Sequence, residues 1–150
     1  MLCGDAVMDE LLLPGLYRQQ VQELQAKLEE LAEKKISIHT QGITGTAGKG
    51  SGRTEAYFEA HVFRYEKVHS QLVQATERYI EARLSLCRKI ERLENERHKD
   101  ILYHRYVKGD TVKSIMQYYG YNSIRQVFRT LQHAREEFER MYNYGKEGST

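Results

Sequence analysis

Hydrophobic residues recur in an N-terminal stretch at alternating three- and four-residue steps, which place them on one face of an α-helix. The stretch spans about residues 14–35. Its apolar positions are Val21, Leu24, Leu28 and Leu31. Pro14 fits the first turn of a helix, where the N–H that proline lacks would have no partner in any case. The pattern predicts an N-terminal helix within residues 1–36, with Leu11–Leu13 as a candidate short docking helix.

A second hydrophobic stretch is longer and more regular. Its apolar positions are Tyr65, Val68, Leu72, Ala75, Tyr79, Ala82, Leu86, Ile90 and Leu93. This heptad-like seam predicts a coiled-coil-like helix over residues 54–98, with Thr54 as its N-cap. A helix this long needs a partner along the seam. The first helix, folded back antiparallel, is one candidate partner, and a second copy of the chain is the other.

Residues 37–53, between the two stretches, contain five glycines and almost no apolar content. Ordering such a segment gains little against its entropy cost, so we predict a flexible linker. Gly48 and Lys49 have the order found in phosphate-binding loops. Such a loop would also need glycine in place of Ile43 and a hydroxyl residue after Lys49, and it has neither. A contact of Lys49 and Arg53 with nucleic-acid phosphates is the weaker alternative.

After residue 98 the hydrophobic pattern breaks into shorter segments. Two glycines, Gly109 and Gly120, close successive short apolar segments, and Asn122 then opens a longer helix as its predicted N-cap. The apolar positions of the longer helix are Ile124, Val127, Leu131, Ala134, Phe138 and Met141. A short helix, a glycine turn and a longer capped helix predict a helix-turn-helix within residues 99–143.

The composition favours helices throughout. Pro occurs once in 150 residues, although turns and strand edges use it often, and 29% of residues are charged. We therefore predict an all-α fold. Its parts are an antiparallel helical hairpin or coiled-coil body, the helix-turn-helix, and a disordered tail at residues 144–150.

Several classes of protein are disfavoured. The longest apolar run, Leu11–Leu13, is far shorter than the roughly 20 residues that span a bilayer, and no basic residue precedes it as in a secretory signal. Cys3 and Cys87 form no disulfide framework, which indicates the reducing cytoplasm. No catalytic or zinc-binding spacing stands out, so we predict no enzyme activity, no cofactor and no metal.

The charge distribution is more informative than the formal net charge of +2. Between Thr111 and Arg135 there are four basic residues and no acid. This local positive field favours contact with double-stranded DNA. The candidate DNA-binding residues are Lys108, Lys113, Asn122, Arg125, Gln126, Arg129 and His133. The alternative is a solvated basic helix in a protein-interaction module.

These candidates are expected to divide between two tasks. Arg and Gln side chains suit guanine and adenine edges in the major groove, and His133 joins Arg125, Gln126 and Arg129 in that group. Lys108, Lys113 and the helix start at Asn122 suit the phosphates. At least one of the tyrosines that crowd the turn, Tyr118, Tyr119 and Tyr121, is predicted to pack, and an exposed one could hydrogen-bond a phosphate.

Residues 101–138 resemble the fourth region of bacterial sigma factors. The matching positions are Leu102, Arg105, Tyr106, Gly109, Thr111, Ile115, Gly120, Val127 and Ala134. With the heptad-bearing helix before it, the chain is similar over residues 54–142 to the phage-encoded RinA/ArpU-like transcriptional regulators. The resemblance implies a phage or prophage regulator, an activator, that binds DNA. In that interpretation the long helix either forms a homo-oligomer or contacts RNA polymerase.

A hypothesis from a different class is a helical assembly protein. A phage DNA-packaging component of the small-terminase kind would use the coiled coil to build a ring. The oligomeric mass separates the two hypotheses, because a dimer favours the regulator and a ring favours the assembly protein.

Overall fold

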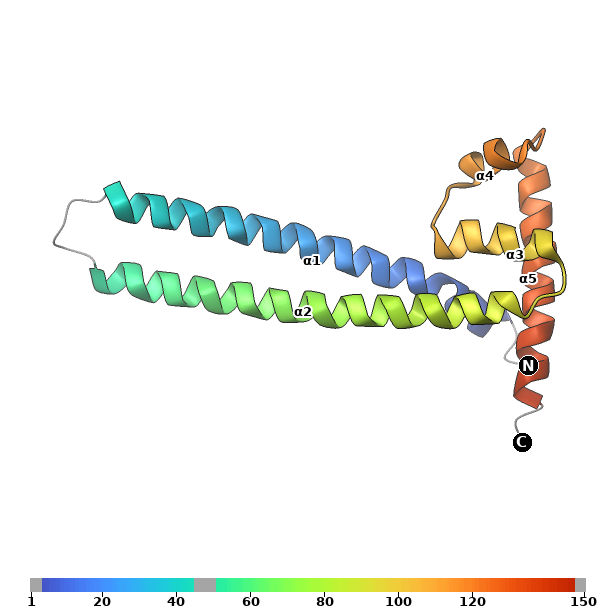
Figure 1. Cartoon of the computed structure of the whole chain (residues 1–150), viewed down its shortest axis with the longest axis horizontal. Helices are drawn as coiled ribbons and strands as arrows, with labels where there is room; N and C mark the ends of the chain where they lie inside the picture. The colour runs from blue at the N-terminus through green and yellow to red at the C-terminus, as the bar shows by residue number, and fades with distance from the viewer. Residues whose placement is uncertain (1–3, 45–50, 148–150) are drawn as a thin grey trace. The chain divides into compact units, whose positions relative to one another are not determined.

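Every secondary-structure element that the structure describes is a helix, which confirms the all-α prediction (Figure 1). The computed structural model describes the backbone of residues 4–44 and 51–147 and the side chains of residues 6–34 and 55–143. The elements are α1 (Gly4–Thr44), α2 (Ser51–Glu91), α3 (Glu96–Leu102), the π-helical turn η1 (Tyr103–Val107), α4 (Val112–Tyr119) and α5 (Ile124–Glu147). The chain divides into two compact units, one formed by Met1–Tyr17 with Tyr79–Thr150 and the other by Arg18–Arg78.

The unit Arg18–Arg78 is an antiparallel helical hairpin. The predicted seam residues of α1, and those of α2 within this unit, are all half-buried or buried. His61 is buried, and its Nε2 donates a hydrogen bond to the carbonyl oxygen of Leu31 at 2.8 Å, which ties α2 to α1. The first of the two predicted partners, the N-terminal helix, therefore covers the seam of the long helix here.

The helices extend into the predicted linker from both sides. α1 continues to Thr44 and α2 begins at Ser51, so the prediction of a linker over 37–53 was too wide. Once a helix is nucleated, each further residue adds one backbone hydrogen bond, which favours continuation through weakly apolar sequence. Residues 45–50 lie outside the described residues.

Pro14 lies inside α1, so the predictions of a helix start at Pro14 and of a separate helix at Leu11–Leu13 were wrong. An internal proline costs about 3 kcal/mol or more, because it removes a hydrogen bond and crowds the preceding turn. Val7, Leu11 and Pro14 follow the helical period and are all buried in the core of their unit. Burying the Val and Leu side chains contributes about 1.5–3 kcal/mol each, which offsets the cost.

The unit formed by Met1–Tyr17 and Tyr79–Thr150 has one hydrophobic core. Its buried residues are Val7, Leu11, Leu86, Ile90, Leu93, Ile101, Leu102, Tyr106, Val107, Ile115, Val127, Leu131, Ala134 and Phe138. All six elements contribute to it. At its edge the Lys89 ammonium pairs with Glu10 and lies 5.1 Å from the centre of the Tyr142 ring, so one side chain joins α1, α2 and α5.

The long helix predicted over residues 54–98 is broken. α2 ends at Glu91, and α3 begins at Glu96 after a turn. Asn95 is the N-cap of α3, and its side-chain oxygen accepts from the N–H groups of Arg97 and His98 at 3.0 and 3.3 Å. This cap replaces hydrogen bonds that a continuous helix would have made, and Leu93 stays buried within the turn.

α5 is longer than predicted at its C-terminal end. It continues to Glu147, into the predicted tail at 144–150, of which residues 148–150 lie outside the described residues. None of the described helices combines the length and the apolar character needed to cross a bilayer.

Candidate nucleic-acid interface

α4 is capped at both of its ends, and a short turn joins it to α5. Thr111 begins α4, and its hydroxyl oxygen accepts from the Ser114 N–H at 3.1 Å. Gly120 ends α4 with φ +71°, the left-handed conformation that glycine adopts without a steric cost. The Tyr121 N–H then donates to the carbonyl oxygen of Met116 at 3.0 Å, which closes the C-terminal turn of α4.

The residue that caps α5 is Ser123, so the prediction of Asn122 as N-cap was wrong. The Ser123 hydroxyl accepts from the Gln126 N–H at 3.4 Å. The Gln126 side chain reaches back, and its oxygen accepts from the Asn122 N–H at 3.1 Å. The pair resembles a capping box, except that the return hydrogen bond comes from the N–H of Asn122, one residue before the N-cap Ser123. It engages the oxygen of Gln126, which the sequence had suggested for reading adenine.

α5 buries one face against the unit's core and exposes the other. Its buried positions are Val127, Leu131, Ala134 and Phe138. Ile124 was predicted to continue this stripe, but it is 46% exposed, because it stands in the first turn at the edge of the face that Val127 and Leu131 define. The sequence period alone could not locate where the core ends.

The exposed face of α5 carries two adjacent rows of side chains. Arg125, Arg129 and His133 form one row at four-residue steps, and Ile124, Phe128 and Gln132 form the other. All six residues are exposed. The structure therefore brings Arg125, Arg129 and His133 together as predicted. Phe128 was not among the predicted site residues. Its position in the sequence, next to Arg129 and one helical turn after Ile124, could have indicated that it shares their face.

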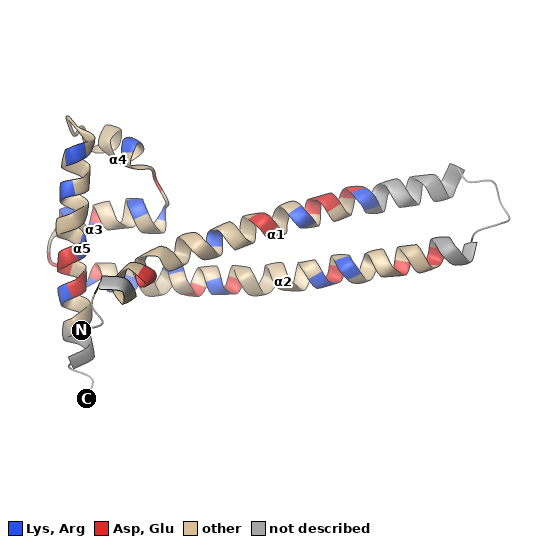
Figure 2. Ribbon diagram, turned by 180° about the vertical axis from the view of Figure 1, so that it is seen from behind, with Lys and Arg blue, Asp and Glu red and all other residues tan. Residues whose placement is uncertain are grey.

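The N-terminal part of α5 carries Arg125 and Arg129 and no acid, whereas acidic and basic residues are mixed in its C-terminal part (Figure 2). Lys113 is exposed on α4. Arg135 marks the boundary, where its guanidinium donates to the Tyr106 hydroxyl at 3.1 Å. Lys113 on α4 and the first turns of α5 thus present positive charge, and no carboxylate lies between them in the sequence.

Lys108 belongs to a different polar group, centred on Asp110. The Lys108 ammonium lies 3.9 Å from the Asp110 carboxylate, which the His104 Nδ1 also approaches at 2.8 Å. The Arg105 guanidinium donates to the Asp110 carbonyl oxygen at 3.0 Å. The acid beside Lys108 reduces the field that this lysine offers to a phosphate.

The π-helical turn η1 (Tyr103–Val107) lies directly before Lys108 and sets the register of the buried residues around it. The Lys108 N–H donates to the carbonyl oxygen of Tyr103, five residues earlier, at 2.9 Å. Buried Ile101 and Leu102 are followed by buried Tyr106 and Val107, again five residues later. A π turn places residues five apart on one side, whereas an α-helix would rotate the second pair away.

Aromatic rings pack around the end of α4. The ring centroids of His104 and Tyr118 lie 4.8 Å apart, and those of Tyr118 and Tyr119 lie 5.0 Å apart. The Tyr119 hydroxyl is buried without a hydrogen-bond partner among the described residues, and burial raises the pKa of Tyr119 to about 12. Tyr118 is 71% exposed, so it is the tyrosine of the turn that is available to a ligand.

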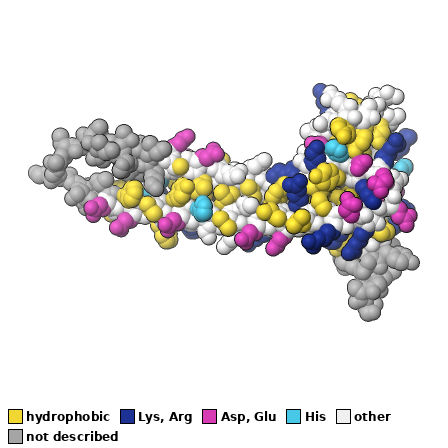
Figure 3. Space-filling model, viewed as in Figure 1, with side chains coloured by type: hydrophobic (Ala, Val, Ile, Leu, Met, Phe, Trp, Pro, Cys, Tyr) yellow, Lys and Arg dark blue, Asp and Glu magenta, His cyan; other side chains and the backbone are white. Residues whose placement is uncertain are grey.

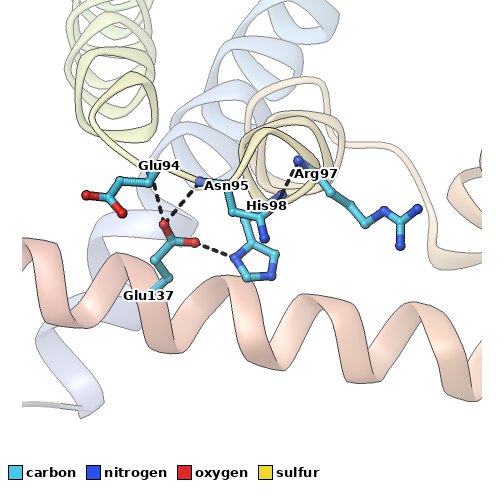
Figure 4. A network of polar contacts seen from close by, with 5 residues as sticks. All are labelled: Glu94, Asn95, Arg97, His98 and Glu137. Carbon is cyan, nitrogen blue, oxygen red and sulfur yellow. Dashed lines mark hydrogen bonds and ion pairs between the residues drawn. The ribbon is translucent and has the colours of Figure 1, made fainter.

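α5 is fixed to the turn between α2 and α3 by Glu137 (Figure 4). One carboxylate oxygen accepts from the N–H groups of Glu94 and Asn95 at 3.0 and 3.3 Å, and the other pairs with the His98 imidazole. Burial alone would raise the pKa of Glu137, but the hydrogen bonds from His98, Glu94 and Asn95 outweigh it and lower that pKa. The charged form of Glu137 therefore helps to hold α5 in place.

The comparisons with known proteins add no relative. No protein-family model matches the chain, and no curated protein or solved structure is similar to it at a significant level. Among the described side chains, no cluster of three or more His, Cys, Asp or Glu residues is suited to hold a metal ion. The α4–α5 surface itself is therefore the feature that indicates a function.

Proposed function

We propose that this chain is a transcriptional regulator that binds double-stranded DNA with α5 in the major groove, as the resemblance to RinA/ArpU-like phage regulators suggests. The observation that carries the proposal is the exposed row Arg125, Arg129 and His133 on a helix that follows a glycine turn, in a segment without acids. An α-helix fits the major groove, and Arg is suited to the edge of guanine.

The phosphate contacts in this proposal come from the supporting residues. Lys113 lies in the first turn of α4, and Asn122 and Ser123 lie in the turn directly before α5. Contacts of this kind set the register of a protein on the duplex without reading its sequence. The chain acts here by binding rather than by catalysis, within a bacterial host, and RNA polymerase is the further partner that an activator would contact.

Selection of duplexes from a random-sequence library by the full chain at low salt tests the proposal. We expect a preferred site, with Arg129→Ala costing about 1–3 kcal/mol on that site because a base contact is lost. Arg140→Ala is the matched control. It removes the same charge from an exposed position of α5 that lies among acids, and it should leave the affinity unchanged. A chain that retains no duplex at low salt would overturn the proposal.

One observation favours a second candidate function, self-assembly through the hairpin. Tyr57 and Phe63 in the unit Arg18–Arg78 are 72% and 69% exposed, and Figure 3 shows hydrophobic side chains at the surface along the hairpin. A packaging-type assembly protein would bury such side chains between copies. The molar mass of the chain in solution distinguishes a ring from the dimer expected of a regulator.

A further inference from the structure

Two large apolar side chains stand exposed at the start of α5, on the same surface as its arginines. Ile124 is 46% exposed and Phe128 is 52% exposed, whereas Val127 between them is fully buried. They are one helical turn apart, so they lie next to one another along the row that ends at Gln132. An isolated exposed apolar residue is ordinary on a protein surface, but a neighbouring pair flanked by cations is a patch of defined chemistry.

The charge around this patch determines which partner it fits. Arg125 and Arg129 follow Ile124 and Phe128 directly in sequence, and the nearest acids in sequence, Asp110 and Glu136, lie outside residues 111–135. A complementary partner must be anionic and must also offer apolar groups beside its charges. The major groove satisfies both conditions, because phosphates line it and the C5 methyl of thymine is the apolar group on its base edges.

The spacing of the two side chains fits the spacing of base pairs. Four residues of an α-helix rise about 6 Å, and two base-pair steps along one strand rise about 6.8 Å. A helix lying along the groove therefore brings side chains one turn apart to bases about two pairs apart. Arg125 and Arg129 have the same separation in the neighbouring row, so apolar and cationic contacts alternate along the groove.

We propose that Ile124 and Phe128 contact thymine methyl groups, so that the preferred duplex carries thymines beside the bases that Arg125 and Arg129 contact. This inference rests on the proposed DNA binding and extends it to the kind of site that is read. Phe128, which is the more exposed of the two, is expected to make the larger contribution.

Replacing thymine by deoxyuridine tests this inference, since it removes the methyl group and leaves the base-pairing and phosphates intact. The full chain first selects its preferred duplex, and each thymine of that duplex is then replaced in turn. We expect the affinity of the unsubstituted protein to fall about fourfold for each contacted methyl that is removed, the effect of one methyl-sized apolar group. Phe128→Ala should lose this sensitivity at one thymine position, and Ile124→Ala at another.

Two controls separate loss of the contact from loss of the fold. Arg125→Ala should bind more weakly overall but keep the same response to deoxyuridine. Phe128→Ala and the unsubstituted protein should bind the duplex that lacks the contacted methyl with equal affinity, which a misfolded variant could not do.

The other outcomes are distinct. If the protein binds its selected duplex but ignores deoxyuridine at every position, the methyl contacts are overturned and the proposed function stands. Equal sensitivity of Phe128→Ala and the unsubstituted protein overturns the assignment to Phe128. If Phe128→Ala leaves the affinity for the selected duplex unchanged, the patch serves a protein partner instead. Failure to retain any duplex at low salt overturns the proposed function together with this inference.

Discussion

The imidazole of His98 on α3 and the carboxylate of Glu137 on α5 form a part-buried pair between residues 39 positions apart in the sequence. The same carboxylate accepts the N–H groups of Glu94 and Asn95, which have no intrahelical partner in the turn before α3. Besides its buried core face, α5 is thus held by one acidic side chain, which lies about two turns beyond Arg129 and about three turns beyond Arg125.

Glu137→Ala should lower the free energy of unfolding by about 1–3 kcal/mol, because it removes several hydrogen bonds to a charged group. Urea denaturation at neutral pH measures this change. Glu136→Ala is the matched control, since Glu136 is exposed and its single side-chain hydrogen bond, from Gln132, is long at 3.4 Å. A loss as large in Glu136→Ala as in Glu137→Ala would contradict the role assigned to Glu137.

The contribution of Glu137 should also depend on pH. Its pKa is lowered in the folded protein, so the unfolded chain binds a proton more readily than the folded one does. The stabilisation is then fully present above the ordinary pKa of 4.5 and is lost as the pH falls through the lowered value. The unsubstituted protein should have a larger free energy of unfolding than Glu137→Gln above pH 4.5. Denaturation at decreasing pH should show this difference shrinking as the pH falls from 4.5 through the lowered pKa of Glu137.

Replacing either of two glycines by alanine should change the stability of the protein, but in opposite directions. Gly15 is exposed inside α1, and a Cβ there meets nothing within 4 Å, so Gly15→Ala should stabilise the protein by up to about 1 kcal/mol. Gly120 also has open space around it, but its φ is +71°, so Gly120→Ala should destabilise by about 1–2 kcal/mol. Melting temperatures of the two variants check this, and a rise for both would show that α4 does not end in the left-handed conformation.

Tyr119→Phe should stabilise the protein by about 1 kcal/mol or more, because it removes a buried hydroxyl without a partner among the described residues. Tyr118→Phe, at an exposed position, should change the stability by less than about 0.5 kcal/mol. Burial raises the pKa of Tyr119 from 10.0 to about 12, so the unfolded chain loses this proton first and stability falls between these two values. Tyr119→Phe should lack that alkaline component in denaturation at rising pH.

The salt dependence of DNA binding should reveal which lysine touches the backbone. If about four to six phosphates are neutralised, the logarithm of the affinity falls with the logarithm of the salt concentration at a slope on the order of −4 to −5. Lys113→Ala should reduce this slope by about one and weaken all sequences alike. Lys108→Ala should have a smaller effect, because Lys108 lies 3.9 Å from the Asp110 carboxylate. Titrations at several salt concentrations measure both slopes.

Features set by local chemistry were predicted well from the sequence. Gly120 ends α4 as predicted, because glycine adopts the positive φ of this position without a steric cost. The seam from Tyr65 to Leu93 lies buried or half-buried at every position, because the three- and four-residue steps follow from helical geometry. The helix end and the period of the seam follow from the local sequence alone, whereas the burial of the seam also requires a partner helix.

Features set by tertiary packing could not be predicted in this way. Pro14 lies fully buried inside α1, against its own local preference for the first turn of a helix. The break after Glu91 depends on the Asn95 cap and on Glu137 from another helix. Ile124 follows the apolar period of α5 but lies beyond the edge of the core, which periodicity does not show.

The π turn at Tyr103–Val107 has a consequence for insertions and deletions. An α-helix returns a side chain to the same face after about 3.6 residues. In this segment the return takes five residues, which places Tyr106 and Val107 on the same buried face as Ile101 and Leu102. The chain here carries the equivalent of one inserted residue. Deleting one exposed or half-exposed position, such as Tyr103, would leave the later core residues in frame on a regular helix. Most other single-residue deletions in the neighbouring helices would turn their buried faces outward.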